Sequence, residues 1–177
     1  TVGSVNRPPV LQPIADIAAN ESATITINAN ATDPDNDGLL FFINDTRFAQ
    51  NGNIFSWHTT FDDSGVYHVL VTASDGDLED SRDVKITVLN KNRPPVLDPI
   101  QNIRARENTT IIIRASATDP DNRNSVANDD NILVFSINDS RFVQNNSTFT
   151  FEAGFGSAGI ISVDINVSDG EFADSQE

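Results

Sequence analysis

The chain has 177 residues, no cysteine and no methionine, and a formal net charge of −15 at pH 7. This length allows one large domain or two small ones, and the lack of cysteine excludes disulfides and thiolate metal sites. No apolar stretch is long enough to span a membrane, we recognise no signal peptide, and the acidity repels nucleic acid and acidic membranes.

The acidic residues comprise 20 Asp but only 6 Glu. Short Asp side chains in loops are the kind of oxygen ligand that Ca²⁺ takes. A solvated acidic surface explains most of the same charge. Adaptation to high salt explains it equally well, so composition by itself leaves the three interpretations open.

An internal repeat organises the chain. Asn-Arg-Pro-Pro-Val-Leu occurs at 6–11 and again at 92–97, an offset of 86. Ala-Thr-Asp-Pro-Asp-Asn occurs at 31–36 and, at the same offset, at 117–122. A repeat of this length is a complete domain rather than one turn of a solenoid.

The offset then grows from 86 to 94, as the match between 73–81 and 167–175 shows, so the second copy carries an insertion near 123–130. We therefore predict two homologous domains, 1–91 and 92–177. The Pro pair after the junction restricts the backbone there and favours a semi-rigid linker.

Apolar and polar residues alternate along most of each copy, which is the period of a β-strand. The alternation recurs at 23–31, 55–57, 67–73 and 161–167, and the apolar run at 39–43 is expected to form a further strand. No long stretch has helical periodicity. About seven short strands per copy, separated by Asx and Gly turns, favour a two-sheet β-sandwich of immunoglobulin type.

Two aromatic positions test that prediction. Asp-Ser-Gly-Val-Tyr, which ends at Tyr67, is typical of the tyrosine corner of such sandwiches. Ile161 replaces Tyr67 in the second copy, so we expect the corner in the first domain alone. Trp57 alternates with His58 and aligns with Phe151, so we expect it in the core rather than on a sugar-binding surface.

The second copy stops at Glu177, before any counterpart of the inward-facing residues of 84–88. We therefore expect the second domain to lack its final strand within this chain, which leaves 161–167 with an open edge. Thr1–Val2 aligns with Thr87–Val88, so 1–5 is the tail of a preceding strand or a linker. Two interpretations remain: an excerpt from a longer array, or a strand donated by a neighbouring subunit.

The repeated Ala-Thr-Asp-Pro-Asp stretch lies in a turn between two expected strands. Flanking strands, with Asn44 at the position where an EF-hand has its Glu, exclude an EF-hand. Neighbouring strands alternate in direction, so the loops with Asp75 and Asp169 return to the same end of each domain. Clustered carboxylates repel one another unless a cation compensates, and Ca²⁺ suits such oxygen ligands. The alternative is that Asp33 and Asp119 cap turns by accepting backbone N–H groups.

Four landmarks, in order, resemble those of cadherin-like domains: Ala-Thr-Asp-Pro-Asp-Asn-Asp, Val-Tyr-His-Val-Leu-Val-Thr-Ala-Ser-Asp-Gly, Val-Lys-Ile-Thr-Val and Asn-Lys-Asn-Arg-Pro-Pro. They resemble most the dystroglycan-type cadherin-like and immunoglobulin-like repeats of prokaryotic cell-surface proteins. The resemblance covers nearly the whole chain, twice. It implies an all-β chain of two tandem Greek-key β-sandwiches.

The resemblance also implies Ca²⁺ between the domains. By position, the ligands at the junction are Glu21, Asn90, Asn92, Asp119, Asp121 and Asp169. Asp33, Asp35 and Asp75 correspond to ligands of a junction further upstream. The chain departs from the family pattern because it has no Leu-Asp-Arg-Glu motif, for which Asp62 and Asp63 could substitute. Lys91 also stands where the linker usually has Asp, which argues for fewer ions or a weaker site.

Eight Asn-x-Ser/Thr sites occur, where composition predicts about three by chance. They are Asn20, Asn30, Asn44, Asn108, Asn138, Asn145, Asn146 and Asn166. The excess favours an extracellular, N-glycosylated surface. An Asn- and Thr-rich composition also suits turns and outward strand faces, so the alternative stays open. Asn44 and Asn138 occupy equivalent positions and are the strongest candidates.

Nothing in the sequence predicts catalysis. His58 and His68 both lie in the first domain and are expected to face outward, and their counterparts are Glu152 and Ser162. A duplicated active site would be expected to keep such a residue in both copies, and no nucleophile, base and orienting group share a spacing. We therefore expect a protein without enzymatic activity.

The sequence predicts a non-catalytic structural or adhesive module at the cell surface, with tandem spacer domains stiffened by Ca²⁺. Its expected partners are neighbouring repeats of the same chain or identical subunits, together with surface glycans or proteins. One alternative is a segment of an extracellular filament completed by strand donation from a neighbour. Another is a carbohydrate-binding module of a secreted enzyme.

Overall fold

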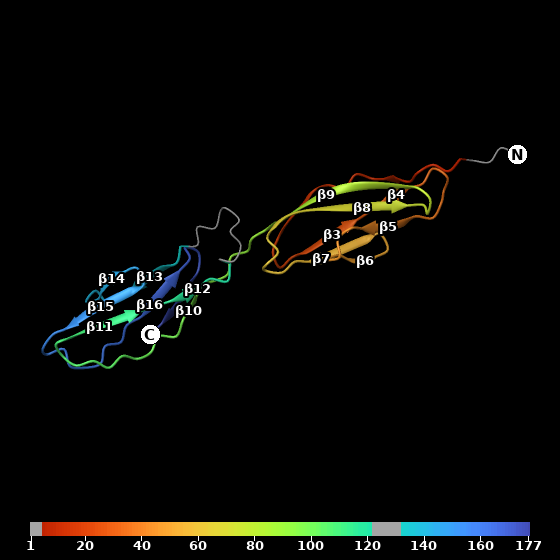
Figure 1. Ribbon diagram of the computed structural model, residues 1–177. Coiled ribbons are helices and arrows are strands. Elements are labelled where there is room, and N and C mark those ends of the chain that lie inside the picture. The colour runs from red at the N-terminus through yellow and green to blue at the C-terminus, as the bar shows by residue number, and fades with distance from the viewer. Residues whose placement is uncertain (1–4, 122–131) are drawn as a thin grey trace. The chain divides into compact units, whose positions relative to one another are not determined.

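The computed structural model of the protein describes residues 5–121 and 132–177. The chain forms two compact units, of which unit 1 ends at Lys91 and unit 2 begins at Asn92 (Figure 1). Within the described residues both units consist of strands without helices. That part of the chain accordingly contains no helix suited to crossing a bilayer. The predicted insertion at 123–130 lies outside the described residues.

Unit 1 is a sandwich of two sheets. Its strands are β1 (Val10–Leu11), β2 (Ile17–Asn20), β3 (Thr24–Asn28), β4 (Ala31–Thr32), β5 (Leu40–Ile43), β6 (Ala49–Asn51), β7 (Ile54–His58), β8 (Gly65–Ser74) and β9 (Glu79–Leu89). One sheet has the order β2-β9-β8-β5, the other has the order β3-β7-β6, and β1 pairs with β4. Each pair is antiparallel except β2 with β9, which run parallel.

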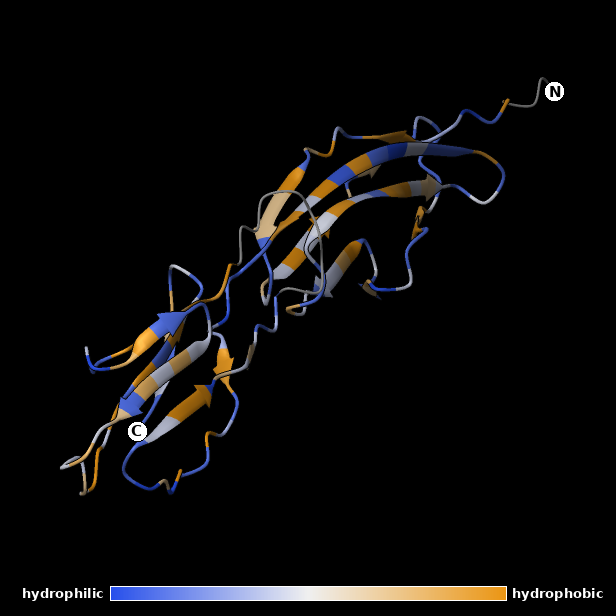
Figure 2. Ribbon diagram, turned by 60° about the vertical axis from the view of Figure 1, so that its left-hand side comes forward, coloured by the Kyte–Doolittle hydropathy of each residue, from blue (hydrophilic) through white to orange (hydrophobic). Residues whose placement is uncertain are grey.

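The core of unit 1 lies between these sheets, as the period-two pattern predicts. On β8 the side chains of Val69, Val71 and Ala73 are fully buried, whereas the neighbouring His68 and Leu70 are exposed. Figure 2 shows the corresponding alternation of hydrophobic and hydrophilic residues along the strands. A one-residue slip of β8 would turn its buried residues to solvent, so burial specifies the register. The predicted immunoglobulin-type fold is confirmed.

The aromatic residues of unit 1 lie where the sequence predicts. The Tyr67 hydroxyl donates a hydrogen bond to the carbonyl of Asp63 at 2.9 Å, which confirms the tyrosine corner. Trp57 is 5% exposed, and its ring meets those of Phe48 and Tyr67 at centroid distances of 5.7 and 5.1 Å. Trp57 therefore belongs to the core and offers no platform for a sugar.

Unit 2 repeats most of this arrangement. Its strands are β10 (Val96–Leu97), β11 (Thr109–Arg114), β12 (Ala117–Thr118), β13 (Val134–Ile137), β14 (Val143–Asn145), β15 (Thr148–Ala153), β16 (Ile165–Ser168) and β17 (Ala173–Gln176). The sheets have the orders β11-β15-β14 and β13-β16-β17, and β10 pairs with β12. The second core gathers around Phe149 and Val167, which are fully buried.

Two predictions for unit 2 need correction. The strand predicted over 161–167 is formed only over β16, and 159–164 is not a strand. The final strand is not wholly absent, because β17 pairs with β16 as the beginning of β9 pairs with β8. β9 continues to Leu89, whereas β17 ends at Gln176, so β17 corresponds to the first half of β9. An extended segment without a neighbour to bond forms no ladder, which explains why 159–164 stays irregular.

The turn after β5 in unit 1 and the turn after β13 in unit 2 are each closed by an Asp–Arg ion pair. In unit 1, Arg47 Nε donates to Asp45 Oδ1 at 2.9 Å. The Arg47 guanidinium also lies 4.5 Å from the ring centroid of Trp57 and 4.1 Å from that of Tyr67. In unit 2, Arg141 Nε donates to Asp139 Oδ1 at 2.9 Å, and its guanidinium lies 5.5 Å from the ring centroid of Phe151. The repeated Asn-Asp-x-Arg-Phe sequence therefore fastens the turn to the core aromatic residues.

In unit 2 this ion pair should keep Asp139 ionised at a lower pH than an ordinary Asp. Hydrogen bonds from the side chain and backbone of Arg141 lower the pKa of Asp139 from 3.8 to about 2. Because the folded-state pKa is the lower one, the pair's stabilisation is fully present above pH 3.8 and is lost as the pH falls through about 2. In an NMR titration, Arg141→Gln should return the pKa of Asp139 toward 3.8, while Arg47→Gln leaves it unchanged. An ordinary pKa of Asp139 in the unaltered chain would contradict this prediction.

Candidate metal centre

Asp119 begins the acidic turn that follows β12 in unit 2. Its side chain is buried, and Oδ1 accepts the backbone N–H of Asp121 at 2.8 Å. This Asx turn is the cap that the sequence offered as the alternative to a metal ligand. The second oxygen, Oδ2, is buried and has no hydrogen-bond partner among the described residues. Asp119 therefore caps the turn and still keeps one oxygen available.

Asp121 is paired with a guanidinium. Arg93 Nε donates to Asp121 Oδ1 at 2.6 Å, and the backbone N–H of Arg93 donates to Oδ2. Arg93 Nη2 also donates to the carbonyl of Pro120 at 3.0 Å. Asp121 is 6% exposed, so it would be a costly buried charge without this partner. An internal cation already compensates this carboxylate.

Asp169 lies in the loop between β16 and β17 and is joined to the first residue of unit 2. Asn92 Nδ2 donates to Asp169 Oδ2 at 3.1 Å and to Glu171 Oε2 at 3.2 Å. Asp169 Oδ1 accepts the backbone N–H groups of Glu171 and Phe172 at 2.8 and 2.7 Å. Burial acts to raise the pKa of Asp169, but these donors outweigh it and lower the pKa below its ordinary value.

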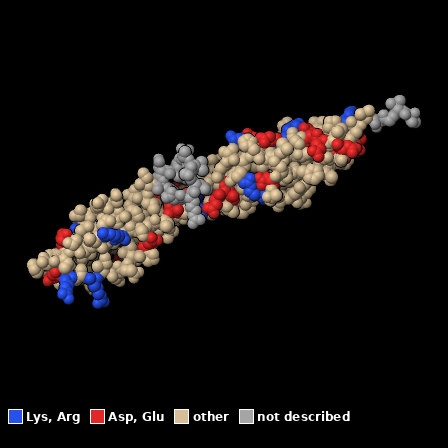
Figure 3. Space-filling model, in the orientation of Figure 1, with Lys and Arg blue, Asp and Glu red and all other residues tan. Residues whose placement is uncertain are grey.

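Unit 1 has the same arrangement at the same end. Asn6 Nδ2 donates to Asp75 Oδ2 at 3.1 Å, and Arg7 Nε donates to Asp35 Oδ1 at 3.1 Å. Asp33 Oδ1 accepts the N–H of Asp35 at 2.7 Å, and Asp33 Oδ2 is again buried with no partner in the described part of the chain. Figure 3 shows acidic side chains gathered at this end of unit 1, where the β4–β5 and β8–β9 loops lie. The geometry is thus a property of the repeat.

The hydrogen bonds in the acidic loops of unit 1 lower the pKa of the carboxylates that accept them. Hydrogen bonding to the Arg7 side chain lowers the pKa of Asp35, and Asp35 in turn raises the pKa of Arg7. The backbone N–H groups of Leu78 and Asp77 lower the pKa of Asp75. Asp35 and Asp75 are therefore ionised at neutral pH, as metal ligands must be.

Glu21 lies at the opposite end of unit 1, directly after β2. It is 2% exposed, and its Oε1 accepts the N–H of Ser64 at 2.8 Å while Oε2 accepts that of Lys91 at 3.0 Å. Both oxygens thus hold backbone segments of unit 1 together. Asn90, which immediately follows β9, is exposed.

The acidic loops fit a cation only in part. The candidate ligand atoms are carboxylate and amide oxygens, which suit Ca²⁺, and Asp119 Oδ2 and Asp33 Oδ2 are buried without a partner among residues 5–121 and 132–177. Most of the other carboxylate oxygens already accept N–H groups. Within residues 5–121 and 132–177, no three His, Cys, Asp or Glu side chains form a group that could hold a metal ion. The predicted Ca²⁺ ligands therefore stay a prediction.

The sequence analysis missed the two arginines. Arg7 and Arg93 occupy the same place in the Asn-Arg-Pro-Pro repeat, just before the first strand of each unit. An Arg retained in both copies, in a chain with a large excess of acidic residues, was the available signal. Its partner could not be deduced, because Arg7 and Asp35, like Arg93 and Asp121, are 28 residues apart with several strands between them.

The other candidates are placed as follows. Seven of the eight Asn-x-Ser/Thr asparagines are exposed, and Asn166 is half-buried. Asn44 Oδ1 accepts the N–H of Leu70 on β8, and Asn138 Oδ1 accepts the N–H of Asp164, just before β16, each at 2.8 Å. His58 and His68 are exposed, as predicted.

Comparison with known proteins agrees with this architecture. Residues 6–87 match the family model described as bacterial Ig domain. Chitinase A of Pseudoalteromonas piscicida is 27% identical over 135 residues, which covers 68% of this chain and 16% of the chitinase. The chain thus spans about a sixth of the length of this curated relative.

Two solved structures share the fold. A Drosophila N-cadherin EC1-4 structure matches with a TM-score of 0.61 and 15% identity, covering 97% of this chain and 48% of that one. Human protocadherin-24 EC1-2 (form II) matches with a TM-score of 0.56 and 16% identity, covering 98% and 94%. Together with the match of residues 6–87 to the bacterial Ig domain, these likenesses show that the chain has the fold of tandem immunoglobulin-like, cadherin-like domains.

Proposed function

We propose that this protein is a non-catalytic spacer or adhesion segment of an extracellular protein. Support comes from the duplicated sandwich, in which each unit has its own core and equivalent loops. A sandwich repeated in tandem sets a spacing between whatever its ends carry. The exposed Asn-x-Ser/Thr sites suit an extracellular surface that carries N-linked glycans.

We further propose that the acidic loops bind Ca²⁺. In unit 2 the ligands would be Asp119, Asp121, Asp169 and Asn92, and the open oxygen is Asp119 Oδ2. In unit 1 they would be Asp33, Asp35 and Asp75. Bound Ca²⁺ would supply positive charge and fix the loop conformation. Arg93 already neutralises Asp121, so the site is expected to be weak.

Thermal unfolding of the chain in Ca²⁺ and in EDTA, at constant ionic strength, tests this proposal. A ligand that binds only the folded state adds about 2.7 kcal/mol of stability at a hundred times its Kd. We expect Ca²⁺ to raise the melting temperature and Asp119→Asn combined with Asp33→Asn to abolish the rise. Asp37→Asn, which removes a charge from the third aspartate of the same turn, is the matched control and should keep it. Equal melting in Ca²⁺ and EDTA would refute the calcium site and leave the spacer role standing.

A carbohydrate-binding module is the second candidate, because the curated relative is a chitinase. The single Trp and the single Tyr of the chain are the usual sugar-stacking residues, yet both pack in the core of unit 1. Exposed rings are therefore phenylalanines, of which Phe155 is 85% exposed. Binding to chitin that Phe155→Ala abolishes would favour this candidate over the spacer.

A further inference from the structure

β5 and β13 occupy equivalent edges of their sheets. β5 is the outer strand of the sheet β2-β9-β8-β5, and β13 is the outer strand of the sheet β13-β16-β17. Among the described residues, no strand pairs with the far side of either one. An open edge presents unpaired N–H and C=O groups, to which a strand of another molecule can bond. These two edges are therefore places where copies of the chain could associate.

The register of β5 shows which of its backbone groups face outward. The N–H of Asn44, directly after β5, donates to the carbonyl of Leu70 at 3.2 Å, so these two residues form a hydrogen-bonded pair. Along an antiparallel ladder such pairs alternate with pairs that exchange no hydrogen bonds. Phe41 and Ile43 therefore point their N–H and C=O groups away from β8.

One of these outward carbonyls already has a partner. Gln50 Nε2 donates to the carbonyl of Phe41 at 2.6 Å and to that of Gly52 at 2.9 Å. Gln50 lies on β6, which belongs to the opposite sheet of the sandwich. Its amide group thus bridges the edge of one sheet and the β6–β7 turn of the other. We call this contact the glutamine bridge.

Unit 2 repeats the glutamine bridge. Gln144 Nε2, on β14, donates to the carbonyl of Phe135 at 2.6 Å and to that of Asn146 at 2.9 Å. The N–H of Asn138 donates to the carbonyl of Asp164 at 3.1 Å, so the same alternation turns the carbonyl of Phe135 outward. The same donor therefore meets the same outward carbonyl in both units, although the residues of the adjoining turn differ.

The strand beside the bridge is strongly apolar in unit 1. Residues 39–43 read Leu-Leu-Phe-Phe-Ile, without a charge, a Pro or a Gly. Leu40 and Phe42 are 60% and 49% exposed, and on β13 Val134 is 59% exposed. Short uncharged segments of high β-propensity are the kind that pair with their own copies. The sequence of β5 thus favours association wherever its edge is free.

We infer that Gln50 and Gln144 keep β5 and β13 from pairing with the same edges of a second copy of the chain. A strand added to β5 has to bond the outward groups of Phe41 and Ile43, and the Gln50 amide already bonds the Phe41 carbonyl. Pairing of two β5 edges would break the glutamine bridge in both copies. The bridge therefore opposes association at an edge that the chain carries twice.

Sedimentation velocity of the whole chain over a range of concentrations, in EDTA, tests the inference. We expect Gln50→Ala combined with Gln144→Ala to dimerise with an association constant at least about tenfold larger than that of the unaltered chain. The reason is that neither copy then gives up a glutamine hydrogen bond on pairing. The matched control is Gln12→Ala, which removes the same amide from another exposed position of unit 1 and should sediment like the unaltered chain.

A merely structural bridge gives a different result. If the glutamines only tied the two sheets together, the double variant would melt at a lower temperature and sediment as the unaltered chain does. That outcome would overturn the inference. Trp57 lies in the core of unit 1, so its emission in the same samples reports whether unit 1 of the variant is folded.

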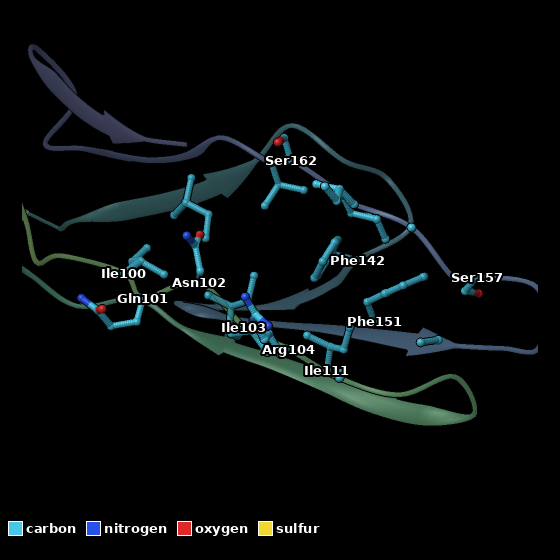
Figure 4. A pocket seen from close by; sticks show the side chains of 18 of the residues that line it. Ile100, Gln101, Asn102, Ile103, Arg104, Ile111, Phe142, Phe151, Ser157 and Ser162 are labelled. Carbon is cyan, nitrogen blue, oxygen red and sulfur yellow. The ribbon is translucent and has the colours of Figure 1, made fainter.

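Hydrogen exchange locates the contact. In the associated double variant, exchange of the outward amides of Phe41 and Ile43, or of Phe135 and Ile137, should slow as the concentration rises. The other surface to compare is a pocket of about 1020 Å³ in unit 2. Figure 4 shows Phe142 and other residues that line it, and none of its lining residues comes from β13. Slower exchange confined to the residues of that pocket would overturn the inference.

A charge on each edge should reverse the association. Phe42→Lys and Ser136→Lys, added to the double variant, place an ammonium group on the solvent face of β5 and of β13. Charged side chains on an edge strand oppose pairing with another strand. We expect this chain to sediment as the unaltered chain does, and undiminished association would refute the edge as the contact. The calcium proposal is not affected by either result, because every measurement is made in EDTA.

Discussion

Replacing Phe55 with alanine is expected to destabilise unit 1 by about 3–5 kcal/mol. Phe55 is fully buried on β7, where its ring fills the space between the two sheets. Its removal leaves a cavity lined by residues that neighbouring strands hold in place, so the core cannot collapse to fill it. This is among the largest effects that a single core substitution should produce in the chain.

The measurement is urea unfolding followed by tryptophan fluorescence. Trp57 is the only Trp of the chain and lies in the core of unit 1, so its emission reports the unfolding of that unit. The matched control is Phe149→Ala, at the equivalent position in unit 2, which should leave the Trp57 transition in place. A large shift of that transition by Phe149→Ala would show that the two units unfold as one.

Removing the carboxylate of Glu21 should cost unit 1 about 1–3 kcal/mol, through the hydrogen-bonding groups left behind. Glu21 connects three parts of the unit, since its Oε1 and Oε2 accept the N–H groups of Ser64 and Lys91 and its own N–H donates to Leu89. In Glu21→Ala the two donors lose their acceptors. Water reaches Lys91, which is exposed, and this limits the loss.

The control for Glu21→Ala is Glu107→Ala, its counterpart in unit 2. Glu107 is exposed, and its Oε1 accepts the N–H groups of Gly156 and Ala158. The Trp57 transition should therefore shift in Glu21→Ala and stay in place in Glu107→Ala. We expect the same loss for Glu21→Ala in Ca²⁺ and in EDTA, because backbone groups already use both oxygens. A loss seen only in Ca²⁺ would instead make Glu21 chiefly a metal ligand.

The acidic loops illustrate how far sequence reasoning reaches. The repeat placed Asp121 and Asp169 at one end of the second domain, and in the structure the adjacent residues Asn92 and Arg93 bond Asp169 and Asp121, respectively. The Asx pattern of the sequence predicted that Asp119 could cap the turn. The ion pair between Arg93 and Asp121 could not be predicted, because the two residues are 28 positions apart and meet only when the chain folds.

The sequence by itself determined the duplication, the strand period and the buried face of each strand, because these depend on local spacing and on the transfer of apolar side chains from water. Only the tertiary structure decided which carboxylates are neutralised internally, since Arg7 and Arg93 meet their partners through folding. It also decided whether residues 159–164 form a strand. This segment has the same alternation as the beginning of β8, yet it forms no strand in unit 2. A strand is stabilised by the neighbours that satisfy its N–H and C=O groups, and 159–164 pairs with no strand in the described part of unit 2.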